Sequence, residues 1–165
     1  MKKSTYKKHW PKKNLGELVN FLEARYGGAI SLNELAGDLG NTVGSWSNLF
    51  NRDDMKLTKA EAIARHYGYS LTLMFPERIF ESGYHPPVRV RPCTTAGNLT
   101  GMYLWIRDSG MTLKQVADRM GITPNVITKA FKTGDILIST LYLFTDTFGI
   151  TVLWEFNKEE QKTKN

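Results

Sequence analysis

Cysteine is almost absent from this chain of 165 residues, whose single Cys is Cys93. One thiol can form neither an internal disulfide nor a thiolate zinc cluster, and its rarity is typical of a reducing compartment. Histidine is scarce as well: His9, His66 and His85 are scattered, and none has a ligand-like neighbour at metal-site spacing. We therefore expect no metal site and no cofactor.

Long apolar runs are missing too. No stretch approaches the roughly 18 apolar residues that span a bilayer, and the Lys-rich start lacks the apolar segment of a secretory signal. These absences predict a cytoplasmic protein with no membrane partner. The chain also lacks phosphate-binding glycine loops, a GxSxG nucleophile turn and paired carboxylates at helical spacing. We expect that it is not an enzyme.

What the chain does contain is an internal repeat. Residues 31–75 align without a gap with residues 112–156, at an offset of 81 positions. Seven identities fall at constrained positions: Leu32 and Leu113, Ala36 and Ala117, Gly40 and Gly121, Thr42 and Thr123, Phe50 and Phe131, Gly68 and Gly149, Phe75 and Phe156. The shared alanine suits a close helix crossing, and the glycine four residues later suits a turn with positive φ. Both copies therefore have the spacing of a helix-turn-helix.

Residues typical of helix starts support the same alignment. Capping boxes, in which two residues satisfy each other's backbone N–H groups, are predicted at Ser31 with Glu34, Thr58 with Glu61, and Thr112 with Gln115. Thr123 before Pro124 is typical of an N-cap and a first helical residue. The predicted helices are 32–39, 43–51 and 58–67 in the first copy, and 113–120, 124–132 and 139–148 in the second.

Further elements are predicted on both sides of each copy. Helical stripes precede the copies, at Leu18, Phe21, Leu22 and Arg25 and at Leu99, Met102, Tyr103 and Ile106. β-Branched and aromatic residues predict strands at 69–75 and 150–156. A lone strand leaves its backbone unpaired, so we expect these two to pair antiparallel about a pseudo-twofold axis, or each to pair in trans within a homodimer. Residues 88–92, VRVRP, are a third candidate strand.

These elements predict a mainly α fold with a small β element, built from two helix-turn-helix units in pseudo-twofold tandem. The chain would be a monomeric pseudo-dimer or a homodimer. Its predicted organisation is a basic disordered arm (1–13), a first unit with its tail strand (14–75), a linker (76–97), a second unit with its tail strand (98–156) and a tail (157–165).

The segment GMTLKQVADRMGITPNVITKAFKTG resembles the helix-turn-helix of phage repressor and Cro-type, lambda-repressor-like regulators, and the resemblance covers about 98–150. It implies binding of double-stranded DNA with a recognition helix in the major groove. It also implies a set of core residues: Val116, Ala117, Met120, Ile122, Ile127 and Phe131. The tail strands are similar to those by which some antitoxin-type repressors of this superfamily dimerise.

The resemblance implies a DNA-contacting face on each unit. In the second unit its residues are Thr112, Lys114, Thr123, Pro124, Asn125, Thr128, Lys129 and Lys132. Amide and ammonium groups suit adenine, guanine and phosphate, which is why Asn125, Lys129 and Lys132 are its central candidates. In the first unit the face comprises Thr42, Gly44, Ser45, Ser47, Asn48, Asn51 and Arg52.

The first unit departs from the family pattern. Asn41 replaces an apolar turn residue, and Gly44 lowers the stability of the recognition helix by about 0.5–1 kcal/mol. Asp53 and Asp54 follow the helix and are expected to repel phosphate. Trp46 aligns with Ile127, so we expect it in the core rather than stacked on a base.

The formal net charge of +6 is concentrated at one end of the chain. Six lysines carry it, namely Lys2, Lys3, Lys7, Lys8, Lys12 and Lys13, and the remainder sums to zero. The arm is therefore expected to neutralise DNA phosphates. Together these features predict a sequence-specific DNA-binding protein that regulates transcription. The alternative is a helix-turn-helix scaffold that binds a protein, as an interaction module or antitoxin-like partner, which the near-neutral repeats and the acidic pair favour.

Overall fold

A computed structural model describes residues 13–25, 31–76, 78–80, 83–85 and 94–156 of the protein. The first half holds four helices: α1 (Gly16–Arg25), α2 (Leu32–Leu39), α3 (Val43–Arg52) and α4 (Leu57–His66). The second half repeats the order with α5 (Thr95–Ser109), α6 (Leu113–Met120), α7 (Pro124–Thr133) and α8 (Ile138–Phe148). Strand β1 (Tyr69–Met74) follows α4, and strand β4 (Thr151–Phe156) follows α8. The mainly α fold with a small β element is confirmed, and the predicted elements of the two copies lie within one residue of their expected bounds.

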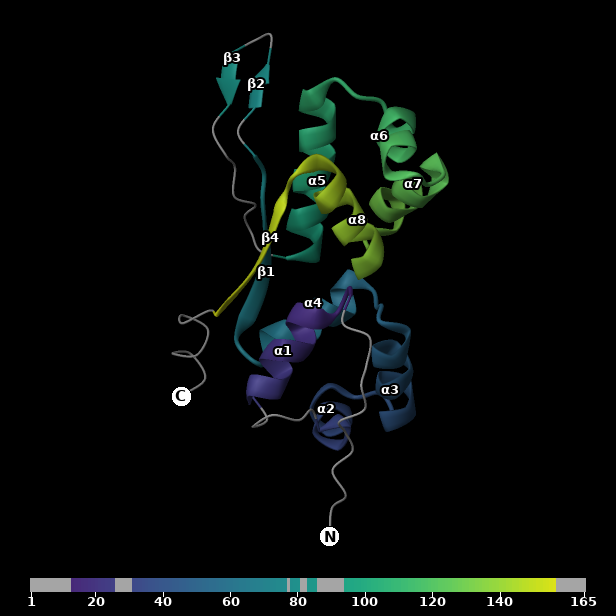
Figure 1. Ribbon diagram of the computed structural model, residues 1–165. Helices are drawn as coiled ribbons and strands as arrows, with labels where there is room; N and C mark the ends of the chain where they lie inside the picture. The colour runs from purple at the N-terminus through teal and green to yellow at the C-terminus, as the bar shows by residue number, and fades with distance from the viewer. Residues whose placement is uncertain (1–12, 26–30, 77, 81–82, 86–93, 157–165) are drawn as a thin grey trace.

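The two halves are joined by their tail strands. β1 and β4 run antiparallel within one chain, with Thr72 opposite Leu153 at the centre of the ladder. Thr72 and Leu153 are 81 positions apart, so they occupy the same position of the repeat. Figure 1 shows this ribbon crossing from one group of helices to the other. The predicted antiparallel pairing is confirmed.

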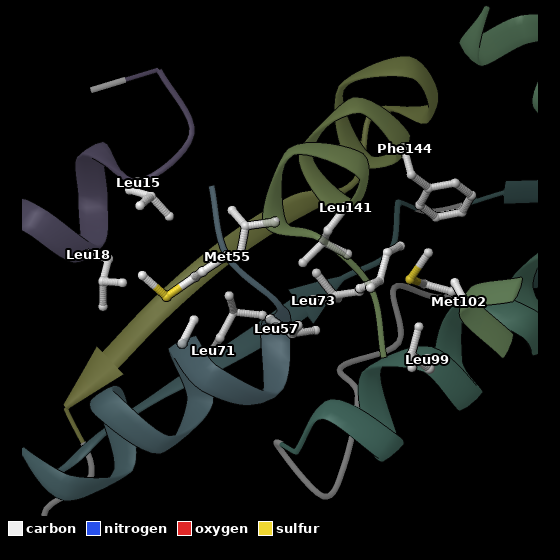
Figure 2. Packing of buried hydrophobic residues seen from close by; sticks show 14 of the residues in the cluster. Leu15, Leu18, Met55, Leu57, Leu71, Leu73, Leu99, Met102, Leu141 and Phe144 are labelled. Carbon is white, nitrogen blue, oxygen red and sulfur yellow. The ribbon is translucent and has the colours of Figure 1, made fainter. Parts of the chain in front are cut away.

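A single hydrophobic core spans both halves. Side chains from α1, from β1 and from the helices of the second half belong to one buried cluster. Figure 2 shows Leu71 and Leu73 of β1 in the same cluster as Met55 of the first half and Leu141 of the second. Burying apolar area contributes about 25 cal/mol per Å², so this shared cluster strongly favours the joined arrangement over two separate units.

The turns between helices two and three differ in the two copies. Gly121 has a φ of 73° and a left-handed conformation at the end of α6. In the first copy both Gly40 and Asn41 have positive φ, 74° and 75°. The positive φ predicted at both glycines is confirmed. The extra left-handed residue is Asn41, an amino acid that tolerates this region better than most.

One predicted capping box, that of Thr58 with Glu61, is wrong. Helix α4 begins at Leu57 with Lys56 as its N-cap and without a side-chain capping bond. The side chain and backbone N–H of Thr58 instead donate to Asp135 of the second half. Glu61 accepts hydrogen bonds from Thr95 of α5 rather than capping its own helix. Both groups of the expected box therefore have partners in the other half of the chain.

The other helix starts are closer to expectation. Thr112 and Gln115 form both bonds of a capping box. The hydroxyl of Ser31 accepts the N–H of Glu34 at 3.2 Å. Thr123 is the N-cap of α7, but its side chain makes no capping bond.

The segment expected to be a linker contains a short hairpin that the sequence analysis missed. Strand β2 (Arg78–Phe80) pairs antiparallel with strand β3 (Gly83–His85). The candidate strand at 88–92 lies outside the described residues, as does Cys93.

Candidate nucleic-acid interface

Helix α7 presents a continuous polar face. Ile127 and Ala130 are buried, at 0% and 6% exposure, and they fix which side of the helix packs inward. The outward side carries the predicted residues Asn125, Thr128, Lys129 and Lys132, all of which are exposed. Positions three and four apart share one face of a helix, so these side chains form one stripe.

The nitrogen groups of this stripe are available to a ligand. Within the described part of the chain, no hydrogen bond or ion pair engages the side chains of Asn125, Lys129 and Lys132. The hydroxyl of Thr128 donates to the carbonyl of Pro124 at 3.1 Å, which leaves its oxygen lone pairs as acceptors. Helix α7 therefore offers one amide and two ammonium groups to solvent, a set suited to base edges and phosphates.

Further predicted residues stand at the start of α6, the helix that packs against α7. Lys114 is exposed. Thr112 is also predicted to contact phosphate. Its hydroxyl oxygen already accepts the N–H of Gln115 at 3.1 Å. Its hydroxyl proton remains the group that can reach a phosphate.

Helix α3 carries a different kind of face. Of its predicted residues, Thr42, Gly44, Asn48, Asn51 and Arg52 are exposed. The half-buried pair Ser45 and Ser47 is tied into local hydrogen bonds: Thr42 donates to Ser45, and Asn51 donates to Ser47. Arg52 is the only cation of the helix. This face is less charged than that of α7 and more engaged with itself.

Trp46 belongs to the core, as its alignment with Ile127 predicted. Its side chain is 2% exposed, and the indole Nε1–H donates to the carbonyl of Gly40 at 3.0 Å. The ammonium of Lys59 lies 5.4 Å from the centre of its ring. Trp46 thus fastens the turn before α3 and is not an exposed stacking residue.

The acidic pair after α3 has structural partners. Asp53 is 6% exposed and accepts the backbone N–H groups of Asn14 and Leu15 at 2.9 and 3.0 Å. Asp54 accepts the backbone N–H of Ser139 at 3.0 Å, at the start of α8. The sequence predicts that both carboxylates repel phosphate, and it gives no sign that they hold the segment before α1 and the start of α8.

The Asp54 bond has a counterpart in the other half. Asp135, the repeat equivalent of Asp54, accepts the backbone N–H of Thr58 at 3.1 Å. Between these bonds the two connecting segments run antiparallel, with Lys56 opposite Leu137. Each recognition-helix candidate is therefore followed by a segment that clamps the other half of the molecule.

The predicted basic arm lies almost wholly outside the described residues. Of its lysines only Lys13 is described, and it is exposed. It lines a cavity of about 800 Å³ that is also bordered by Glu17 of α1 and by Tyr142 and Asp146 of α8. Lys2, Lys3, Lys7, Lys8 and Lys12 fall in the part that is not described.

Two groups that line this cavity have shifted pKa values. Burial raises the pKa of Tyr142 to about 12, against the lowering effect of a hydrogen bond from the indole of Trp154. The nearby charges of Glu17 and Asp146 raise it further. Burial also raises the pKa of Glu17. The cavity wall carries two carboxyl groups, Glu17 and Asp146, beside the ammonium of Lys13.

Helices α3 and α7 lie on the same side of the β1–β4 ribbon (Figure 1). In Figure 1, α3 and α7 are both drawn at the right, and the β1–β4 ribbon lies at the left of the helices. The connections from α3 to α4 and from α7 to α8 lie between them. Helices α3 and α7, which carry most of the predicted residues, therefore lie on the same side of the ribbon in this view.

The described ranges contain no group of three or more His, Cys, Asp or Glu side chains that could hold a metal ion. None of the described helices has both the length and the apolar character needed to cross a bilayer. Comparisons of the chain with family models, curated proteins and solved structures found no match.

Proposed function

We propose that this protein binds double-stranded DNA in a sequence-specific manner, as a transcriptional regulator that uses two helix-turn-helix units. The observation that carries the proposal is the exposed stripe of α7, where Asn125, Lys129 and Lys132 have no protein partner in the described chain. Solvated amide and ammonium groups on one helix face match the donors and acceptors of the major groove.

We further infer that the two units are related by a pseudo-twofold axis. Two pairs of residues that are equivalent in the repeat face each other, Thr72 with Leu153 and Lys56 with Leu137. The bonds from Thr58 to Asp135 and from Ser139 to Asp54 are likewise exchanged between equivalent positions. An axis through both facing pairs would relate α3 to α7, as half-site recognition by a dimer requires.

The two units would not read DNA equally. Helix α7 and the start of α6 carry Lys114, Lys129 and Lys132, whereas α3 carries Arg52 alone. Phosphate contacts by Lys and Arg supply most of the sequence-independent affinity. We therefore expect the second unit to dominate binding and the first to add a weaker or different half-site.

The test is selection from a random double-stranded DNA library on the full-length protein at near-physiological salt, followed by sequencing of the bound pool. We expect two unlike half-sites about 10 base pairs apart, the spacing of one helical turn. A single enriched half-site would assign reading to one unit. An unenriched pool would refute sequence-specific binding and favour the protein-binding alternative.

Single substitutions then assign the residues. Asn125→Ala is expected to weaken binding to the selected site by about 1–3 kcal/mol and to relax the preference at one base pair. Asn48→Ala on α3 is the matched amide deletion in the other unit. Equal weakening by Asn125→Ala on every sequence would make Asn125 a positioning contact and would contradict its role in base reading.

A further inference from the structure

The connections that follow α3 and α7 form a short two-stranded contact. The N–H of Leu57 donates to the carbonyl of Ile136 at 2.7 Å, and the N–H of Ile138 donates to the carbonyl of Met55 at 2.9 Å. These two bonds flank Lys56 and Leu137, which face each other as a non-hydrogen-bonded antiparallel pair. Side chains in such a pair lie close together.

The direction of these two side chains follows from their neighbours. Met55 and Leu57, on either side of Lys56, are 0% and 1% exposed. Ile136 and Ile138, on either side of Leu137, are 3% and 0% exposed. Successive side chains of an extended segment point to opposite faces, so Lys56 and Leu137 point away from the core.

The exposure of these two side chains agrees with their pointing away from the core. Lys56 is exposed, Leu137 is 37% exposed, and the Lys56 ammonium has no ion-pair partner in the described chain. In Figure 1 these connections lie between α3 and α7, on the side of the core away from the β1–β4 ribbon. One cation and one apolar side chain therefore project side by side, midway between the two candidate recognition helices.

Resting on the proposed function, we propose that Lys56 contacts a backbone phosphate at the centre of the DNA site, between the two half-sites. A Lys ammonium is a point charge that holds phosphate and carries no base information of its own. Leu137 occupies the equivalent position of the other half and cannot make the same contact. The central contact is therefore made once, to one strand.

The first measurement compares the salt dependence of binding for the full-length protein and its Lys56→Gln variant. Each phosphate contact contributes about 0.9 to the slope of log affinity against log salt concentration. We expect Lys56→Gln to lower that slope by about 0.9 and to leave the selected sequence unchanged. Arg65→Gln, further along α4 and ion-paired to Glu61 at 2.8 Å, removes the same charge and should leave the slope unchanged.

The complementary variant adds the missing cation. Leu137→Lys should steepen the slope by about 0.9, because it supplies a second ammonium at the equivalent position. Both sites are exposed, so these variants should fold, and circular dichroism spectra identical to that of the wild type verify this. An unchanged slope in Lys56→Gln, or an equal fall in Arg65→Gln, would overturn the central contact.

Phosphate ethylation interference on the wild-type protein locates the contact directly. Ethylation of a phosphate between the half-sites should weaken wild-type binding, and this effect should vanish for Lys56→Gln. Interference confined to the half-sites would overturn the proposal and leave sequence-specific binding intact. Failure of the wild-type protein to bind any selected sequence would instead refute the proposed function, and this inference with it.

Discussion

Asp54 and Asp135 each hold the first turn of a helix from the opposite half. Replacing a capping acceptor by alanine costs about 0.5–2 kcal/mol. We expect Asp54→Ala and Asp135→Ala each to lower the free energy of unfolding by about that amount, because each leaves a helix-start N–H without its acceptor. Urea unfolding followed by circular dichroism measures the change. Asp118→Ala, which removes an exposed carboxylate of α6, should change stability by less than about 0.5 kcal/mol. A loss in Asp118→Ala as large as in Asp54→Ala would contradict the clamp.

The titration of Tyr142 makes the free energy of unfolding depend on pH in the alkaline range. Its pKa rises from 10.0 to about 12 through burial, so the folded protein keeps a proton that the unfolded chain loses first. Below pH 10 both states hold the proton, and the contribution of Tyr142 to stability is fully present. Between pH 10 and 12 the unfolded state binds fewer protons and stability falls as pH rises. Unfolding midpoints across this window should fall more steeply for the wild type than for Tyr142→Phe. Parallel curves would show that Tyr142 titrates normally.

At the scale of the element, α3 is weakened by Gly44 in its first turn. The φ of Gly44 is not positive, and a Cβ there would meet only the hydroxyl oxygen of Thr42, at 3.9 Å. Gly44→Ala should therefore raise the free energy of unfolding by about 0.5–1 kcal/mol. Thermal melts measure the gain. Gly40→Ala is the contrasting variant and should destabilise, because Gly40 has a φ of 74°. Stabilisation by both substitutions would contradict this account.

The helices and tail strands could be predicted because their signals are local. Apolar spacing, the Thr112–Gln115 box and the shared glycines act within a few residues, so they are visible in one sequence. The prediction of a Thr58–Glu61 capping box was wrong because the partners of these two residues are distant in the sequence. Its residues bond to Asp135 and to Thr95, and nothing in the local pattern shows a partner so far along the chain.

The residues of the candidate site also fall into two groups, those that the sequence predicts and those whose position depends on distant contacts. The exposed stripe of α7 followed from the resemblance to a helix-turn-helix family, and the buried Trp46 followed from the alignment of the two copies. The inward placement of Asp53 and Asp54 could not be predicted from the sequence. Carboxylates that follow a helix are expected to lie in solvent unless their partners are known. Lys56 was also missed, since its position opposite Leu137 depends on how the halves meet.

At the scale of the whole molecule, the β1–β4 pairing can be tested as a covalent link. Thr72→Cys with Leu153→Cys, in a Cys93→Ser background, should form a disulfide within one chain because these residues face each other. Closing so long a loop should stabilise the protein by about 2–4 kcal/mol, provided the geometry is unstrained. Non-reducing electrophoresis distinguishes the products. Dimers linked between chains at low protein concentration would instead indicate strand exchange in a homodimer.

Because β1 and β4 belong to one chain, each half of this molecule is encoded by its own stretch of sequence and can mutate independently of the other. In a homodimer every substitution is made twice, so neither half can change without the other. Here Asp53 stands where the second half has Gly134, and Lys56 where it has Leu137. One half can therefore acquire a new surface while its counterpart keeps the old one, and the shared core continues to hold them together.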